Sequence, residues 1–103
     1  MKKLTKKDLQ KILKTIDQSW KINSAGNAIT RIFDIKNYIE ALIFLSKVVV
    51  HAEVKGIFPT ITINSTKVKI MLSVPAKSKL TNIEFNFAKE IDSLILSTAT
   101  FRL

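Results

Sequence analysis

Cysteine is absent from this chain, and histidine occurs once, at position 51. Without cysteine there is no disulfide framework, no thiolate metal site and no cysteine nucleophile. A single histidine removes most of the metal-binding and acid–base constellations that histidine supplies. We therefore expect neither a metal ion nor a cofactor. Glycine and proline are also scarce, with 2 of each, which excludes collagenous and loop-rich chains.

Long hydrophobic runs are missing as well. The most apolar run, 41–45, ends at Ser46 and Lys47, whereas a helix that spans a membrane needs about 20 apolar residues. The N-terminal lysines are followed by further lysines and by no apolar stretch of signal length. These absences predict a protein without a membrane segment or an export signal, and we expect a cytoplasmic location.

Acidic residues are few compared with basic ones, 8 against 17, which gives the 103-residue chain a formal net charge of +9. Such a balance favours acidic partners, either nucleic acid or an acidic protein. Apolar residues make up 47% of the chain, which is enough to form a hydrophobic core and too apolar for intrinsic disorder. At this length we expect one domain over 1–103.

The N-terminal segment has the pattern of a basic amphipathic helix over about 5–17. Thr5 and Asp8 have the spacing of a capping box. The apolar residues that follow recur at i, i+3, i+4 and i+7 and so share one face, while lysines occupy the other face. This apolar set is Leu9, Ile12, Leu13 and Ile16.

A second helix is expected from about 35 to 54, with Asp34 as its N-cap and Gly56 at its end. Its apolar residues cover more of the circumference than one face of a sheet could bury. A second burial partner is therefore implied, either a larger protein or another helix of the same chain. We expect the partner interface to comprise Ile43, Val49, Val50, Ile57 and Phe58.

Two segments, 20–33 and 60–72, have the alternation of β-hairpins, each with a polar turn near its centre. A third helix is expected to begin with a capping box at Thr81 and Glu84 and to end near residue 97. The resulting order α-β-β-α-β-β-α predicts a single α+β domain, in which a four-stranded antiparallel sheet carries the helices on one face.

Several short segments stand at distinctive positions along this order. They are Trp20, Phe33 to Lys36, Ala52-Glu53, Pro59, Lys67-Val68, Leu72-Ser73, Leu80 to Glu84 and Phe87 to Asp92. In this collinear arrangement the chain resembles the pterin-4a-carbinolamine dehydratase family, also known as dimerisation cofactors of a homeodomain transcription factor. The similarity runs without gaps from about Leu4 to Ser97.

The resemblance implies where proton transfer would occur. The family dehydrates a 4a-hydroxytetrahydropterin with a His-His-Pro motif before the third strand, a histidine after the fourth strand and an aspartate at the start of the last helix. The corresponding positions here are Ile57-Phe58-Pro59, Pro75 and Glu84. Isoleucine, phenylalanine and proline side chains cannot transfer protons, and one positioned acid–base group is worth about 10²–10⁴ in rate. We therefore expect a retained scaffold without catalytic residues.

Two remaining titratable side chains have structural explanations. His51, near the end of the second helix, is interpreted as a partly buried, hydrogen-bonded histidine, because no carboxylate or second histidine is spaced to make it a ligand. Glu84 is interpreted as the capping-box acceptor of the third helix in preference to a general acid.

A cationic surface is expected from the segment between Val54 and Ile83, which contains no acidic residue. Lys67 and Lys69 are two apart on an expected strand and therefore project from the same face. With nearby lysines they would form a patch for phosphates or an acidic segment, the other interpretation being an ordinary solvated face. The patch comprises Lys55, Lys67, Lys69, Lys77 and Lys79.

The favoured hypothesis is a noncatalytic binding module, a small basic accessory subunit that docks on a larger protein such as a DNA polymerase or another replication or transcription assembly. Two alternatives stay open: a divergent dehydratase of 4a-hydroxytetrahydropterin, and a free-standing protein that binds nucleic acid nonspecifically through its backbone. Members of the resembled family form dimers and tetramers, so homo-oligomerisation stays open too.

Overall fold

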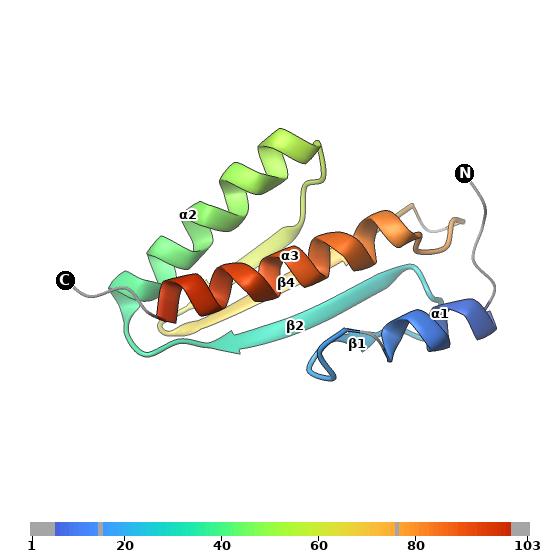
Figure 1. The fold of residues 1–103 in the computed structure, drawn as a ribbon, viewed down its shortest axis with the longest axis horizontal. Helices are drawn as coiled ribbons and strands as arrows, with labels where there is room; N and C mark the ends of the chain where they lie inside the picture. The colour runs from blue at the N-terminus through green and yellow to red at the C-terminus, as the bar shows by residue number, and fades with distance from the viewer. Residues whose placement is uncertain (1–5, 15, 76, 100–103) are drawn as a thin grey trace.

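The helices of the chain lie together on one face of a sheet (Figure 1). The computed structural model describes residues 6–14, 16–75 and 77–99. The elements follow in the predicted order, and the α+β fold class is confirmed. Their bounds are α1 (Lys6–Leu13), β1 (Lys21–Ile22), β2 (Ala28–Asp34), α2 (Tyr38–Lys55), β3 (Thr60–Asn64), β4 (Lys67–Ser73) and α3 (Asn82–Ala99).

The sheet has the strand order β1-β2-β4-β3, and all neighbouring strands are antiparallel. Because side chains alternate along a strand, Val68, Ile70 and Leu72 of β4 point to one face, where they are buried. Lys67 and Lys69 point to the other face and are exposed. Both expected hairpins are confirmed.

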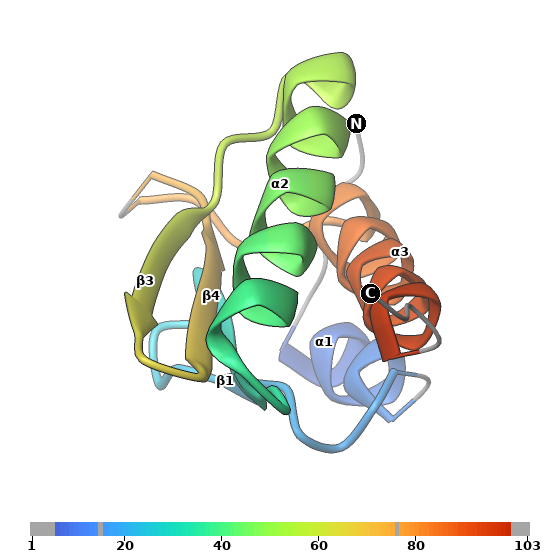
Figure 2. The same cartoon turned by 90° about the vertical axis from the view of Figure 1, so that its left-hand side faces the viewer.

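All three helices cover the face to which the buried β4 residues point. Figure 2 shows the strands on one side of the molecule and α1, α2 and α3 on the other. None of the described helices crosses to the opposite face of the sheet, which we call the open face. The protein therefore presents two chemically different sides, a helix side and the open face.

Aromatic residues from three segments meet in the core. Trp20, which precedes β1, is 1% exposed and contacts Phe33 of β2 edge-on, with ring centroids 6.1 Å apart. Phe33 also packs on Phe44 of α2 at a centroid distance of 4.8 Å. Such aromatic pairs are worth about 0.5–1.5 kcal/mol beyond their buried area. These contacts hold α2 against the sheet.

The first helix is shorter than the sequence suggests. α1 ends at Leu13 and not near residue 17, because Asp17 forms a turn in which its carboxylate accepts a hydrogen bond from the Ser19 N–H at 2.8 Å. Ile16 is buried as expected, but it reaches the core from this turn and not from the helix. Thr5, the expected capping residue, lies outside the described residues.

The second helix begins later than expected, at Tyr38, and the prediction of Asp34 as its N-cap is wrong. Asn37 is the cap, since its side chain accepts a hydrogen bond from the Glu40 N–H at 2.9 Å. Asp34 is the last residue of β2, where it pairs with Lys67 of β4. The strand therefore runs through the position at which the helix was expected to start.

The third helix begins as predicted. The Thr81 hydroxyl oxygen accepts from the Ile83 N–H at 3.2 Å, and the Glu84 carboxylate accepts from the Thr81 N–H at 2.6 Å. These reciprocal hydrogen bonds are those of a capping box. α3 continues to Ala99, within the usual uncertainty of its expected end.

Candidate functional site

The loop between α2 and β3 holds three positions that the family resemblance marks as catalytic. Gly56 ends α2 in the left-handed conformation, with φ 70°, and the N–H groups of Gly56 and Ile57 both donate to the Ala52 carbonyl oxygen. This turn packs Ile57 against the core and leaves Phe58 72% exposed. The side chains of Ile57, Phe58 and the following Pro59 carry no group that can transfer a proton.

The Glu84 side chain is buried and engaged at the N-terminus of α3. Its Oε1 atom accepts hydrogen bonds from both the N–H and the hydroxyl of Thr81, at 2.6 and 2.8 Å. A carboxylate at this place also faces the positive end of the helix dipole. The capping interpretation is therefore confirmed. The remaining implied position, Pro75, is exposed.

A hollow of about 260 Å³ lies between the end of α2 and the start of α3. Its lining is mixed, since three of the five lining residues are apolar while Lys55 and Asn86 carry polar groups. The lining residues are Lys55, Ile57, Ile83, Asn86 and Phe87.

The lone histidine bridges α2 and α3. His51 Nδ1 lies 2.5 Å from Glu90 Oε1, and the other oxygen of the same carboxylate lies 3.2 Å from Lys55 Nζ. Burial raises the pKa of Glu90, but the hydrogen bonds from His51 and Lys55 outweigh it and leave the pKa below its ordinary value. The prediction of a hydrogen-bonded, partly buried histidine is confirmed. Its carboxylate partner is 39 residues away in the chain, so local spacing gave no sign of it.

A second polar cluster, which the sequence does not reveal, lies between α3 and the sheet. The Asp92 carboxylate accepts from the Trp20 indole N–H at 3.0 Å and from Arg31 at 2.8 Å. Arg31 also lies 3.4 Å from Asp17 and stacks over the Phe33 ring at 4.3 Å. Burial raises the pKa of Asp92 above its ordinary value, although the Trp20 hydrogen bond and the Arg31 charge oppose it. These contacts join three elements, so we assign the cluster to stability.

The side of α2 that faces neither the sheet nor α3 is largely apolar and exposed. Val50 is 59% exposed, and of the other expected interface residues Val49 and Phe58 are exposed while Ile43 and Ile57 are half-buried. α3 packs beside α2 but does not cover this side. We call it the outer face of α2, and its exposed apolar residues are Tyr38, Ile39, Leu42, Val49, Val50 and Val54.

The five lysines of the expected patch do not lie on one surface. Lys67 and Lys69 project from the open face, as the strand alternation predicts. Lys55 lies on the helix side, where it pairs with an α3 carboxylate. Lys77 and Lys79 are exposed in the loop between β4 and α3.

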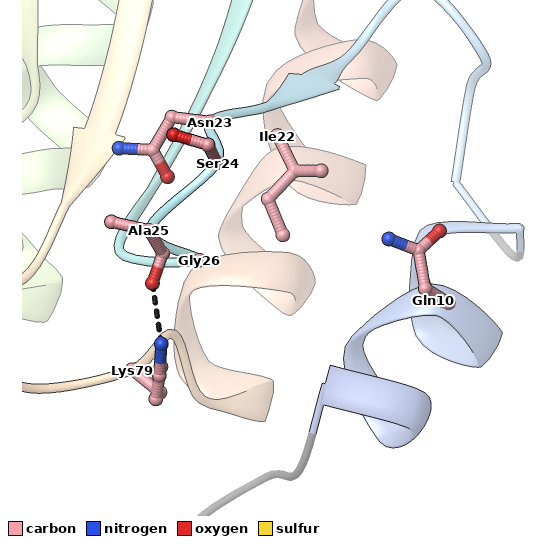
Figure 3. A pocket seen from close by; sticks show the side chains of 7 residues that line it. All are labelled: Gln10, Ile22, Asn23, Ser24, Ala25, Gly26 and Lys79. Atoms are coloured by element: carbon pink, nitrogen blue, oxygen red, sulfur yellow. Dashed lines mark hydrogen bonds between the residues drawn. The ribbon is translucent and has the colours of Figure 1, made fainter.

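Lys79 has a structural contact. Its ammonium group donates to the Ala25 carbonyl oxygen at 2.6 Å and so joins the loop before α3 to the turn between β1 and β2 (Figure 3). A hollow of about 50 Å³ lies beside this contact and reaches Gln10 of α1. A cavity of this size has room for a few water molecules only.

Two further properties concern the described part of the chain. Over residues 6–14, 16–75 and 77–99, no three histidine, cysteine, aspartate or glutamate side chains are grouped so that they could hold a metal ion. Within the same ranges no helix combines the length and the apolar character needed to cross a bilayer.

Comparison with known proteins points to one family. The family model described as pterin 4 alpha carbinolamine dehydratase matches residues 2–94. A protein of Nostoc punctiforme assigned as a pterin-4-alpha-carbinolamine dehydratase is 35% identical over 91 residues, which cover 88% of this chain and 95% of the relative. A protein of Sulfurisphaera tokodaii with the same assignment is 32% identical over 95 residues, covering 92% of this chain and 99% of the relative.

Solved structures agree on the fold. A transcriptional coactivator/pterin dehydratase from Brucella melitensis has a TM-score of 0.82 at 21% identity, covering 91% of this chain and 99% of its own. A pterin dehydratase-like protein identified as a RuBisCO assembly factor in the alpha-carboxysome has a TM-score of 0.65 at 24% identity, covering 75% and 89%. At these identities the likeness establishes the fold alone.

Proposed function

The chain belongs to the pterin-4a-carbinolamine dehydratase family, and from this premise we propose that it is a noncatalytic member, a small basic accessory subunit that docks on a larger protein. One observation carries the proposal: the positions that the resemblance marks for proton transfer hold side chains without transferable protons. These positions are Ile57, Phe58, Pro59 and Pro75.

The only carboxylate at a marked position does not repair this loss. Glu84 is held by two hydrogen bonds from Thr81 at the N-terminus of α3. Catalytic groups that act as a unit fail together when one of them is removed. Glu84 alone therefore supplies no route for both adding a proton to the leaving hydroxyl and removing one from the ring.

The outer face of α2 supports docking on a protein. Burying a valine, leucine or isoleucine side chain contributes about 1.5–3 kcal/mol, and contiguous exposed apolar surface marks interaction sites in soluble proteins. Val49, Val50 and Val54 stand on this face within two helical turns. Phe58, just beyond the helix end, adds a further exposed aromatic side chain.

The kind of partner is supported by charge and by relatives. A net charge of +9 favours a partner with acidic surface or one that works on nucleic acid, such as a polymerase or another replication or transcription assembly. Two proteins of the same fold are described as a transcriptional coactivator/pterin dehydratase and as a RuBisCO assembly factor, so this scaffold is associated with roles beyond dehydration.

A matched pair of variants tests the docking surface. Val50 on the outer face and Ile32 on the open face are 59% and 58% exposed, so a glutamate at either position adds the same charge at the same exposure. The tagged wild-type chain, Val50→Glu and Ile32→Glu are used to recover bound proteins from the native cell extract at low salt. We expect one partner to be retained by wild type and Ile32→Glu and lost by Val50→Glu.

Two outcomes contradict the proposal. Recovery of the chain alone, in high yield, excludes a larger partner. Equal loss of the partner from both variants excludes the outer face of α2. Light scattering of the purified chain completes the test, because a dimer that only Val50→Glu dissociates would identify a second copy as the occupant.

A further inference from the structure

Acidic residues are distributed unequally between the open face of the sheet and the helix side. Of the 8 acidic residues in the chain, all of which the structure describes, Asp34 alone lies in a strand. It is 3.6 Å from Lys67, which remains 62% exposed at its side chain. The other acidic residues lie on the helices or in the turn after α1, so the open face is cationic while the carboxylates gather on the helix side.

The strand register places the open-face donors in a regular array. Lys69 lies between Ile32 of β2 and Thr62 of β3, and the row through Met71 continues across β2 to Lys21. Lys67 and Lys69 are therefore about 7 Å apart along β4, and Lys21 is two strands, or about 10 Å, from β4. The lysine and threonine donors that the strands place on the open face are Lys21, Thr30, Thr60, Thr62, Lys67 and Lys69.

We propose that the open face binds the phosphate backbone of nucleic acid without reading the bases. Ammonium and hydroxyl groups are the common donors to phosphate oxygens, and both alternate across this face. Base recognition is not part of the proposal, because Arg31 points to the helix side and is bound to Asp92. No aromatic side chain of the described strands lies on the open face to stack a base, since Phe33 is buried under the helices.

A nucleic acid suits this face better than an acidic protein does. Exposed ion pairs between proteins contribute only about 0–1 kcal/mol each, because both side chains lose entropy and remain screened. A nucleic acid instead releases condensed counterions when lysines neutralise its phosphates, and this gain needs no pocket. The inference is independent of docking through the outer face of α2, which lies on the other side of the molecule.

The experiment compares two triple variants of the full chain that lose the same charge. Lys21→Gln/Lys67→Gln/Lys69→Gln removes the open-face cations, and Lys11→Gln/Lys14→Gln/Lys89→Gln removes exposed cations of the helix side. Binding to a fluorescent 20-nucleotide oligothymidine is measured by anisotropy between 50 and 200 mM salt. We expect wild-type Kd values of about 10⁻⁴–10⁻⁶ M, typical of nonspecific contacts.

The open-face triple is expected to bind at least about tenfold more weakly at 50 mM salt. Its plot of log affinity against log salt should be less steep by about 2, since each phosphate contact on a single strand contributes about 0.7. The helix-side triple should keep the wild-type slope. Equal weakening of both triples, or no wild-type binding, would overturn the proposal.

Two further measurements keep the proposal testable. If the open-face triple is misfolded by circular dichroism, amide chemical shifts of the wild-type chain are followed during titration with the same oligonucleotide. Shifts confined to β1, β2, β3 and β4 support the proposal, and shifts confined to the helices contradict it. Polyglutamate of equal length is the second ligand, and equal affinity with the same variant dependence would identify the face as a site for acidic protein instead.

Discussion

The indole N–H of Trp20 donates to both carboxylate oxygens of Asp92, at 3.0 and 3.1 Å, and so joins the segment before β1 to α3 across 72 residues of chain. Arg31 from β2 binds the same carboxylate. The carboxylate is therefore the point at which the N-terminal hairpin, the sheet and the last helix are fixed relative to one another. Helix α3 in turn positions one wall of the hollow and the partner of His51.

Replacement of Asp92 by alanine should lower the free energy of unfolding by about 2–3 kcal/mol. The substitution removes the acceptor of the hydrogen bonds from the Trp20 indole and from Arg31, and leaves both donors partly buried without a partner. Urea unfolding at pH 7 measures the change. Glu53→Gln, at an exposed position of α2, is the control and should change stability by no more than about 0.5 kcal/mol. Equal effects of the two variants would show that the cluster is not structural.

The bridge between His51 and Glu90 predicts that the free energy of unfolding depends on pH. Because the folded-state pKa of Glu90 is below its ordinary value, its contribution is present above the unfolded pKa and is lost as the pH falls through the folded pKa. Glu90→Gln should thus cost about 0.5–1 kcal/mol at pH 7, since the bridge is partly exposed, and this difference should disappear in the acid range. Urea unfolding of both proteins from pH 7 to pH 3 follows the difference, and a difference that grows on acidification would contradict the assignment.

The contribution of Asp92 to stability should change with pH in the opposite direction. Its folded-state pKa is raised, so its contribution to stability is fully present below the unfolded pKa and is lost as the pH rises through the folded pKa. The carboxyl resonance of Asp92, followed by NMR during an acid titration, should titrate at higher pH than that of Asp17, whose pKa is lowered by the hydrogen bond from the Ser19 N–H. A reversed order would show that burial is not the dominant influence on the pKa of Asp92.

The capping role of Glu84 predicts that charge matters less than hydrogen bonding. Glu84→Ala should destabilise the protein by about 1 kcal/mol, or about 4–8 °C in Tm, because two hydrogen bonds to Thr81 are lost. Glu84→Gln retains an acceptor at the same place and should remain within about 0.5 kcal/mol of wild type. Calorimetry distinguishes the two, and an equal loss in both variants would mean that the side chain acts through its charge.

Gly56 should tolerate some side chains better than others. Its φ of 70° is the left-handed conformation, and a Cβ atom added there would meet nothing within 4 Å. The penalty for Gly56→Ala is therefore backbone strain alone, about 1 kcal/mol, and Gly56→Asn should cost less because asparagine adopts this conformation more readily. Urea unfolding of both variants gives the order, and an asparagine variant weaker than the alanine variant would contradict this explanation.

Sequence periodicity predicts the fold because β3 and β4 alternate clearly and α3 carries its own capping box. It failed where two local signals competed. Asp34 and Asn37 are both good N-cap residues, and only the pairing of Asp34 with Lys67 across the sheet decides between them. Ile16 fits the helical spacing of α1, yet it belongs to a turn set by Asp17.

At the candidate site, too, the sequence predicts local contacts but not contacts between distant segments. The Glu84 cap depends on neighbours three residues apart, so the sequence could reveal it. The partners of His51 and Trp20 come from α3, 39 and 72 residues away, and no local pattern identifies them. The stretch without acidic residues joins Lys55 to the strand lysines in the sequence, but a helix end and a strand face need not point the same way.

The most direct test of the central claim is the rate of 4a-hydroxytetrahydropterin dehydration with the purified chain. An active dehydratase of the family is assayed in parallel, and Glu84→Gln is included as the variant of the one carboxylate at a marked position. We predict a rate equal to that of buffer for both the wild-type chain and the variant. A wild-type rate above buffer that vanishes in Glu84→Gln would contradict the account.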